Sequence, residues 1–575
     1  MKKIIFGCLC LMSMLITSCS LDENPESKFS EEEAYKTSTL IYVNTVANIY
    51  SAIGSGIYGG TDCIHTLQEF TSDATFLPGR QGDWVDGGKW QNMFLHNFKS
   101  SVDLYATVWN HLYQIIGLCN SSIDKLTALS ATNEEAKPYI YEVRTLRAIY
   151  YYYAMDLFAE VPLVTSSTAS ISSVAQSKRP EVFAFVTKEL AECIPNLSES
   201  ASQKSGLYYG RITKAIAYMC MAKCALNAAV YNIDDASATS YQSFVGDDLS
   251  GACTASETLG AAVTTKGSAV NISLDGTTRN AWETVIYCVD KLASLGYSLQ
   301  AKYADNFVTS NNSSVENIFT RPNDDVTYKI VDYNLMRSIH YNHAGAMGYS
   351  GWNGACSTVH QMIVLGYGTA NQDPRVAINF YTGTDYTADT NGKLVKDGAT
   401  DQDLSYEPMK AIIDFKTGSD AHDVKCAGAR FKKYQYDTSS SIQGCMNNDL
   451  VIWRYGDALL MKAEAEYRLG NTAEALDEIN QIRNRVGAIP ATSVSLNSIL
   501  NERMAELSWE GVRRQDQIRF CTFTQPTEDR YVGVWHNASA GDYNNDTQGY
   551  TCVYPIPYSV INLNKNLKQN PGYSN

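Results

Sequence analysis

Hydrophobic residues recur at steps of three and four along most of this chain, which is the spacing of amphipathic α-helices. The same spacing predicts helices at about 137–158, 180–190, 211–231 and 282–295. The clearest example covers residues 105–126, with apolar side chains at Val108, Leu112, Ile115, Ile116, Cys119, Ile123 and Leu126. The pattern therefore predicts an all-α fold.

Two predicted helices form a unit within residues 453–486. We expect the first helix to end at Gly470, in a left-handed C-cap. Asn471 and Glu474 have the spacing of a capping box at the start of the second helix. The buried face of that helix is predicted at Ala475, Ile479, Ile482 and Val486. Antiparallel helices of this length, with small residues where they cross, are typical of a tetratricopeptide repeat.

A second pair of this kind is predicted at about 211–296. Residues 232–280 interrupt it, and their weak periodicity and small polar composition indicate an insertion. Such repeats bury their hydrophobic faces by stacking, so we expect one superhelical scaffold. Residues 322–448 are irregular and rich in Gly, Asp, Asn and Tyr. This pattern predicts a large loop-rich insertion that carries the ligand surface.

Composition narrows the classes of ligand. The formal net charge is −15, and no cluster of Lys and Arg stands out, which disfavours nucleic acid as a partner. The 575 residues include 38 Tyr and 8 Trp, while only 19% are charged. Aromatic rings stack on the apolar faces of sugars, and their polar edges form hydrogen bonds with hydroxyls. The composition therefore favours a neutral polar ligand such as a sugar.

The chain begins like a bacterial lipoprotein signal. Lys2 and Lys3 precede a short apolar run that ends in Leu15-Ile16-Thr17-Ser18-Cys19. That run is too short to span a bilayer and is typical of a segment that is removed on export. The alternative is a plain signal peptide followed by an incidental cysteine.

The resemblance to lipoproteins divides the chain into three parts. Residues 1–18 are interpreted as the signal peptide. Cys19 becomes the acylated N-terminus, and residues 19–35 form a tether to the membrane. Residues 36–575 are interpreted as a single domain.

The remaining cysteines are expected to be mostly buried thiols. Cys220, Cys224 and Cys288 occupy apolar helix positions, where a thiol packs as a small hydrophobe. Export to an oxidising compartment leaves pairing as the alternative. No Cys-x-x-Cys pair follows Cys19, so the sequence predicts no zinc ribbon.

Three glutamates, Glu502, Glu506 and Glu510, share one face of a predicted helix. Paired carboxylates could hydrolyse a glycosidic bond. The nearby arginines are Arg503, Arg513 and Arg514. We therefore expect ion pairing and not catalysis.

A His-x-x-His pair, His340 and His343, could hold a metal if it lay on a helix. The surrounding Tyr341, Asn342 and Gly345 favour helix poorly, and no third ligand is evident. We therefore expect no metal site, and no nucleotide or other cofactor motif is present.

The best candidate for ligand binding is the loop at residues 73–90. Its Gly and Pro content predicts a loop, yet it contains Trp84 and Trp90. An indole there would stack on a sugar face while Arg80 and Asp83 bind hydroxyls. In the alternative interpretation both tryptophans are buried anchors, and Asp73 forms an internal ion pair with Arg80. Asp73, Arg80, Asp83 and Trp84 are therefore candidate ligand residues.

Several short motifs occur in a characteristic order. They lie at residues 109–120, 142–148, 209–214, 454–470 and 502–513, and in Tyr554-Pro555-Ile556-Pro557 and Gln569-Asn570-Pro571-Gly572-Tyr573. Together with Cys19 they resemble the SusD/RagB family of outer-membrane lipoproteins. The resemblance implies a helical repeat fold and capture of a nutrient, usually a glycan and sometimes a peptide. It also implies a SusC-like TonB-dependent transporter as partner.

The same resemblance implies that the ligand site combines N-terminal loops with the central insertion. Trp352 and Asn353 are then expected beside Trp84. We interpret the protein as a lipid-anchored, outward-facing binder that delivers an oligosaccharide to its transporter. Two other functions remain open: a secreted glycan hydrolase, and a repeat scaffold whose only ligand is a protein.

Overall fold

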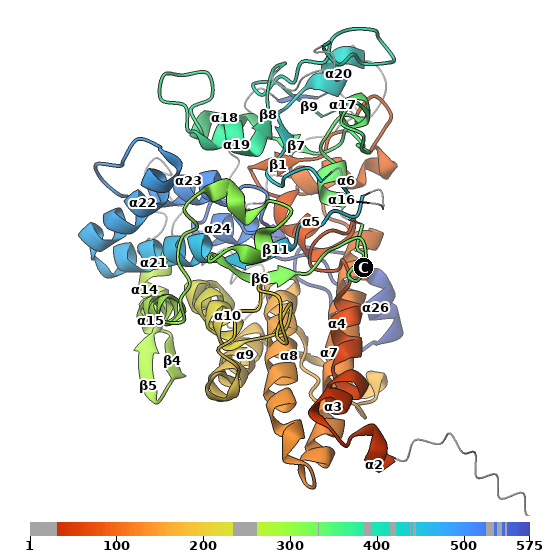
Figure 1. The fold of residues 1–575 in the computed structure, drawn as a ribbon, viewed down its shortest axis with the longest axis vertical. Coiled ribbons are helices and arrows are strands. Elements are labelled where there is room, and N and C mark those ends of the chain that lie inside the picture. Colours follow the sequence, from red (N-terminus) through yellow and green to blue (C-terminus); the bar gives the residue numbers. More distant parts are fainter. Residues whose placement is uncertain are drawn as a thin grey trace, which may run out of the picture.

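The computed structural model describes residues 31–233, 261–331, 333–384, 393–413, 421–437, 439–440, 444–524, 534–536, 543–544, 546 and 549–574. The long helices between residues 103 and 226 lie side by side in the lower half of Figure 1, and many of the shorter helices and strand pairs lie above them. The interpreted signal peptide, Cys19 and most of the tether lie outside the described residues.

The long helices confirm the predicted all-α scaffold. They are α7 (Asp103–Ser130), α8 (Lys137–Phe158), α9 (Arg179–Cys193), α10 (Lys214–Leu226), α15 (Ala281–Ser294), α21 (Tyr455–Leu469), α22 (Thr472–Val486) and α23 (Leu496–Glu506). From α7 to α10, and then through α15, α21 and α22, each helix packs against the next (Figure 1). This continuous stack is the arrangement expected of helical repeats.

Shorter helices surround this stack. They are α2 (Glu31–Ala34), α3 (Ser38–Thr45), α4 (Ala47–Ile53), α5 (Ile64–Glu69), α6 (Lys89–Phe94), α11 (Ala228–Tyr231), α14 (Ala261–Ala269), α16 (Tyr333–Met336), α17 (Tyr341–Ala346), α18 (Val359–Val364), α19 (Arg375–Asn379), α20 (Ala421–Cys426), α24 (Arg513–Arg519) and α26 (Tyr558–Leu563). Within the described ranges no helix is both long enough and apolar enough to cross a bilayer.

The strands form pairs of two. The antiparallel pairs are β1 (Thr75–Phe76) with β7 (Cys356–Ser357), β2 (Val161–Pro162) with β3 (Gln176–Ser177), β4 (Asn271–Leu274) with β5 (Thr277–Asn280), β6 (Asn317–Arg321) with β11 (Leu450–Arg454), and β8 (Phe380–Tyr381) with β10 (Arg430–Phe431). β9 (Ala411–Ile413) and β12 (Val534–His536) pair in parallel. Pairs such as β1–β7 and β6–β11 join segments that are far apart in sequence, whereas β4–β5 is a local hairpin.

The helix pair at residues 453–486 is confirmed, with two corrections. Trp453 belongs to strand β11, so α21 begins two residues later. Gly470 caps α21 with φ of +91°, as predicted. Asn471 does not cap α22 with its side chain. Its amide nitrogen instead donates to Glu466 Oε2 at 2.6 Å, so the preceding helix competes for the capping group.

Part of the predicted insertion at 232–280 has regular secondary structure, which its weak periodicity did not indicate. Helix α14 and the β4–β5 hairpin occupy residues 261–280, while residues 234–260 lie outside the description. The turn residues Asp275 and Gly276 have φ of +51° and +73°. Positive φ at both positions of a two-residue turn is the geometry that an Asp-Gly pair favours. The Asp-Gly pair was therefore an available signal for the hairpin.

The three glutamates on α23 and just after it form ion pairs, as predicted, but with more distant partners. Glu502 binds Arg375 and Arg483, Glu506 binds Arg375, Arg454 and Arg485, and Glu510 binds Arg454 and Lys433. The neighbouring Arg503, Arg513 and Arg514 pair with Asp457, Asp73 and Asp156. Burial opposes the charge of Glu506, yet the surrounding arginines outweigh it and hold its pKa well below the ordinary value.

The prediction of buried thiols is confirmed for the described cysteines. They are Cys63, Cys119, Cys193, Cys220, Cys224, Cys288, Cys356, Cys426, Cys445, Cys521 and Cys552. Each of them is buried, and none forms a disulfide. Burial raises the pKa of Cys552 to about 12, which keeps this thiol protonated and inert.

The left-handed cap at Gly470 gives a first testable prediction. Gly470→Ala should lower the free energy of unfolding by about 1 kcal/mol, because a Cβ is disfavoured at this positive φ. Gly117→Ala is the matched control, since Gly117 lies inside α7 with open space around its Cα. That control should be neutral or stabilising. Chemical denaturation of both variants measures the difference, and equal stabilities would contradict the cap.

Candidate functional site

Strands β1 and β7 bring the two predicted ligand segments together. Thr75 pairs with Ser357 and Phe76 with Cys356, in antiparallel register. The chain that follows β1 therefore lies beside the chain that precedes β7. Trp84 follows β1 and Trp352 precedes β7, so the strand pair places these tryptophans next to each other. The expectation that they meet is fulfilled in the structure.

Three aromatic rings form a continuous surface that we call the aromatic platform: Trp84, Trp352 and Tyr333. The ring centroids of Trp84 and Trp352 lie 6.0 Å apart, with 44° between the ring planes. Tyr333 stacks on Trp352 at 5.0 Å and 26°. All three side chains are partly exposed. Successive tilts of this kind give a bent row of rings, and not a flat one.

Two contacts fix the position of the Trp84 indole. Its Nε1 donates to the backbone oxygen of Trp352 at 2.8 Å, and the buried Trp90 packs against it edge to face at 5.9 Å. A Cβ on Gly354 would lie 2.8 Å from the Trp84 ring, so only glycine allows this approach. Trp84 also has φ of +60°, an unusual value for a bulky residue. The loop therefore keeps the ring at the surface in one orientation.

Arg80 supports the platform from inside the protein. Its side chain is only 1% exposed and donates to the backbone oxygens of Gly354, Val424 and Ala427 at 2.6–3.2 Å. The guanidinium therefore ties the Trp84 loop to two distant segments. This geometry corrects the expected pairing of Arg80 with ligand hydroxyls, because its hydrogen bonds are made to the protein.

Asn353 and Asp73 are also buried. The side-chain oxygen of Asn353 accepts from Arg430 Nη2 at 3.0 Å. Asp73 binds Arg513 through both carboxylate oxygens, at 2.7 and 2.9 Å. The alternative ion pair between Asp73 and Arg80 is therefore not formed. Both residues position the loops that carry the platform, and neither is placed to contact a ligand directly.

Asp83 is the predicted polar residue that remains accessible. It lies one position before Trp84 and is exposed. In the described part of the chain its carboxylate accepts no hydrogen bond, while its backbone pairs with Arg80. A carboxylate beside an aromatic ring can accept hydrogen bonds from sugar hydroxyls. Asp83 is thus the candidate polar group at the edge of the platform.

Tyr333 is the platform residue that the sequence analysis missed. It begins the short helix α16, and its backbone nitrogen donates to the oxygen of Gly59 at 2.9 Å. This contact joins segments about 270 positions apart. No periodicity or motif around Tyr333 marks it, so only the folded chain identifies its role.

The two histidines considered as metal ligands are both buried. His340 is the N-cap of α17, and its Nδ1 accepts from the backbone of Asn342. Burial lowers the pKa of His340 to about 3 and that of His343 to about 4. Among the residues that the structure describes, no group of three or more His, Cys, Asp and Glu side chains could hold a metal ion.

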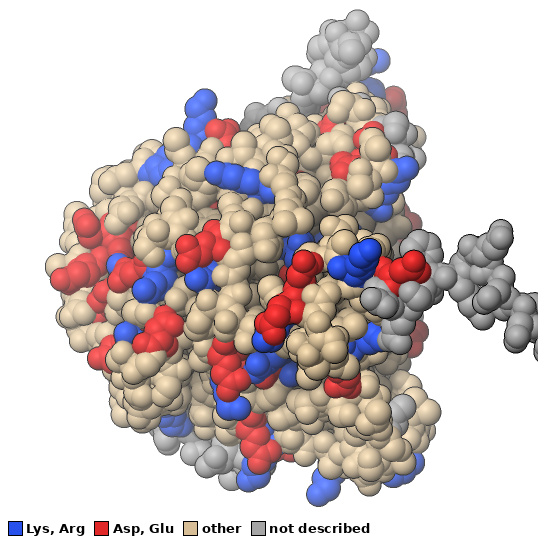
Figure 2. Space-filling view, turned by 60° about the horizontal axis from the view of Figure 1, so that its bottom comes forward, with Lys and Arg blue, Asp and Glu red and all other residues tan. Residues whose placement is uncertain are grey.

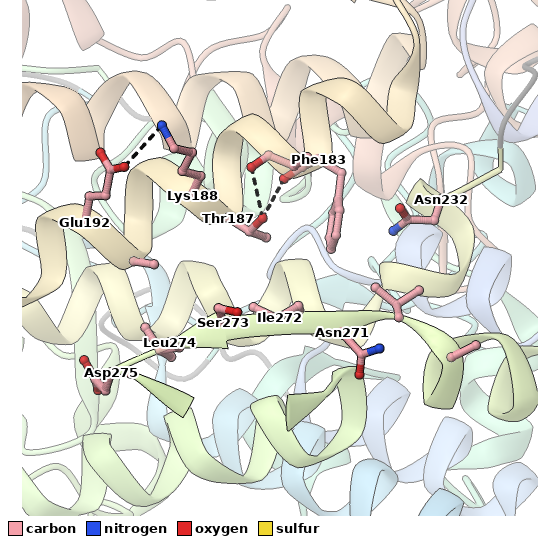
Figure 3. A pocket seen from close by; sticks show the side chains of 15 residues that line it. Phe183, Thr187, Lys188, Glu192, Asn232, Asn271, Ile272, Ser273, Leu274 and Asp275 are labelled. Atoms are coloured by element: carbon pink, nitrogen blue, oxygen red, sulfur yellow. Dashed lines mark hydrogen bonds and ion pairs between the residues drawn. The ribbon is translucent and has the colours of Figure 1, made fainter. Parts of the chain in front are cut away.

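A cavity of about 660 Å³ lies between α9 and strand β4 (Figure 3). Several of its polar side chains interact with each other or with the backbone: Lys188 points toward Glu192, with 3.2 Å between Nζ and Oε1. The hydroxyl of Thr187 donates to a carbonyl of its own helix at 3.0 Å. The cavity extends to Asn232, next to the segment outside the description. It offers no aromatic stacking surface comparable to the platform.

Charge is mixed on the surface. On the face shown in Figure 2, acidic and basic side chains alternate over short distances, and most of the area belongs to other residue types. No extended basic area lies on that face. The view agrees with the composition, which disfavours nucleic acid.

Models of two protein families match this chain. One, described as "SusD family", matches residues 268–573. The other, described as "Starch-binding associating with outer membrane", matches residues 21–226. Starch-binding protein SusD of Bacteroides thetaiotaomicron is 24% identical over 449 residues, which are 75% of this chain and 72% of that protein. SusD-like protein P38 of Formosa agariphila is 32% identical over 159 residues, 25% of this chain and 28% of that protein.

Solved structures show the same fold. A laminarin binding SusD-like protein superposes with a TM-score of 0.63 at 19% identity, covering 93% of this chain and 99% of its own. Surface glycan-binding protein A from Bacteroides thetaiotaomicron, in complex with laminarihexaose, gives a TM-score of 0.62 at 18% identity, covering 92% and 98%. At these identities the likeness concerns the architecture of the chain.

Proposed function

The chain belongs to the SusD family, and from this premise we propose that it captures an oligosaccharide on its aromatic platform. The observation that carries this proposal is the row of partly exposed rings Trp84, Trp352 and Tyr333, in which the Trp84 indole is fixed by a hydrogen bond to the backbone of Trp352. Rings fixed in advance lose little conformational entropy when a ligand stacks on them. Asp83, at the edge, would accept hydrogen bonds from sugar hydroxyls.

A peptide is the second candidate ligand in this family. The platform favours a sugar because it joins three aromatic rings to one carboxylate. An extended peptide is commonly bound by main-chain hydrogen bonds to an exposed strand edge. Strands β1 and β7, next to the platform, are two residues long and buried. They offer little edge for such pairing.

We propose that binding leaves the glycan intact. Glu502, Glu506 and Glu510, the paired acids considered for hydrolysis, are buried and held by arginine and lysine side chains. A glycosidase needs one carboxylic acid that can give up its proton near neutral pH. The low pKa of Glu506 keeps that group ionised, which is unsuited to this role.

A glycan panel tests the function directly. Protein lacking residues 1–30 is titrated with laminarihexaose, with oligosaccharides of starch and with other plant and microbial glycans, by calorimetry. We expect saturable binding of at least one of them and no shorter product on chromatography after prolonged incubation. Affinity for peptides alone would overturn the proposal, and release of product would favour the hydrolase.

We further propose that the protein acts at the outer membrane and passes its ligand to a SusC-like TonB-dependent transporter. Support comes from the family model described as "associating with outer membrane", which matches residues 21–226. The lipoprotein-like sequence ending at Cys19 agrees with attachment by acyl chains. More than one acyl chain on the same protein gives stable anchoring.

Cys19→Ala tests the anchor. The variant should fold normally yet leave the membrane fraction, because the described fold begins at Glu31 and does not include Cys19. Fractionation with and without the transporter measures this. A matched control is Ser18→Ala, which keeps a small residue before the cysteine. If Cys19→Ala stays in the membrane when the transporter is absent, the anchor is elsewhere.

A further inference from the structure

A second cavity, of about 580 Å³, lies between α4, residues 209–211, the end of β6 and residues 327–330. We call it the tyrosine pocket. Its volume is in the range of small-molecule sites, about 300–1,000 Å³. It shares no lining residue with the aromatic platform. The two therefore present separate surfaces to a ligand.

Four tyrosines line the tyrosine pocket: Tyr42, Tyr50, Tyr209 and Tyr328. Tyr42 and Tyr50 come from α3 and α4, and their centroids lie 6.5 Å apart. Tyr209 and Tyr328 come from two loops and meet edge to face at 5.8 Å. Rings on more than one wall can pack against both faces of a saccharide unit.

The charged groups of the tyrosine pocket are all basic. They are Arg211, Arg321 and Lys329, and no Asp or Glu lines the cavity. Glu142 neutralises Arg211 through hydrogen bonds of 3.0 and 2.6 Å. In the described part of the chain, no carboxylate lies within 4.0 Å of Arg321 or Lys329, which leaves two cations in a chain whose net charge is −15.

Arg321 keeps part of its guanidinium available. Its Nε donates to the oxygen of Gly54 at 3.2 Å and its Nη1 to the oxygen of Pro322 at 2.5 Å. For its Nη2, the described residues supply no acceptor. Burial lowers the pKa of Arg321, and the charge of Asp449 offsets only part of that effect. An anion at Nη2 would supply the remaining compensation.

Thr320 also lines the tyrosine pocket. It is 1% exposed, and its hydroxyl has no hydrogen-bond partner within the described ranges. Two carboxylates lie near this wall. Asp449 accepts from the Tyr209 hydroxyl at 2.6 Å through Oδ1, while its Oδ2 has no partner within the described ranges. Asp324 accepts from the backbone nitrogen of Val326 at 2.7 Å.

We propose that the tyrosine pocket binds an anionic sugar unit, whose carboxylate or sulfate group pairs with Arg321 and Lys329 while its ring packs against the tyrosines. The platform and the pocket then recognise different features of a glycan. The platform stacks on the faces of sugar rings, and the tyrosine pocket selects for a negatively charged group.

Binding to a Trp352→Ala background isolates the tyrosine pocket from the platform. Calorimetry with tetragalacturonate, a sulfated carrageenan tetrasaccharide and neutral laminarihexaose separates carboxylate, sulfate and uncharged ligands. We expect at least one anionic probe to bind this background within twofold of its affinity for wild type. Arg321→Gln should weaken that binding at least tenfold.

Lys329→Gln keeps the test decisive if Arg321→Gln folds poorly, because Lys329 is exposed and has no structural partner among the described residues. It should weaken anionic binding several-fold, and more so at low salt. Lys302→Gln is the matched control, an exposed lysine outside the pocket, and should have no effect. The proposal is overturned if neither anionic probe binds, if Lys329→Gln and Lys302→Gln behave alike, or if Trp352→Ala abolishes anionic binding.

Discussion

Trp352→Ala should weaken the binding of neutral oligosaccharides at least tenfold, or about 1.4 kcal/mol, while the protein stays folded. Trp352 is the middle ring of the platform and contacts both Trp84 and Tyr333. The substitution removes the ring but keeps the backbone oxygen that accepts from Trp84 Nε1. The loop should therefore hold its shape, and the loss should reflect stacking alone.

Calorimetric titration and thermal melts on the same samples measure this effect. Tyr558→Ala is the matched control, because Tyr558 is 49% exposed on α26 and lies outside the platform. Wild-type affinity in a stably folded double variant, Trp84→Ala with Trp352→Ala, would contradict the site. Unfolding of Trp352→Ala would instead show that this ring is a structural anchor.

Local sequence was enough to predict the helices because their signals are local. The predicted helix at 137–158 has the observed bounds of α8, with Pro138 in its first turn, where a missing backbone N–H costs nothing. Gly470 likewise predicts the C-cap of α21 from local sequence alone. The capping box at Asn471 was wrong because Glu466, five residues earlier, supplies a stronger partner for the side chain.

The candidate site was only partly predictable. Trp84 and Trp352 stand out as large aromatic residues in polar loops, and they do meet. The role of Arg80 depends on Val424 and Ala427, more than 340 positions away, so burial could not be inferred from its neighbours. An exposed and a buried arginine in a loop have the same local sequence. The fold decides between them.

The second prediction with a large expected effect concerns the stability of the helical scaffold. Arg454, at the end of β11, is fully buried and binds three glutamates: Glu316, Glu506 and Glu510. Its Nε and Nη2 donate to the two carboxylate oxygens of Glu510 at 2.8 and 2.7 Å. The guanidinium thus joins a strand, the helix α23 and the residues that precede β6. If the guanidinium of Arg454 is removed, the positive charge that remains nearby is too small to neutralise the three buried carboxylates.

Arg454→Met should lower the free energy of unfolding by about 3–5 kcal/mol, which is the usual cost of breaking a buried ion pair from one side. Lys137→Met is the matched control, since Lys137 pairs with Glu134 at the surface and should change stability by less than about 1 kcal/mol. Urea denaturation of both variants gives the two values. A loss below 1 kcal/mol for Arg454→Met would mean that Arg485 and Lys433 neutralise the cluster without it. Because the platform lies outside this network, glycan affinity measured below the unfolding transition should remain that of the wild type.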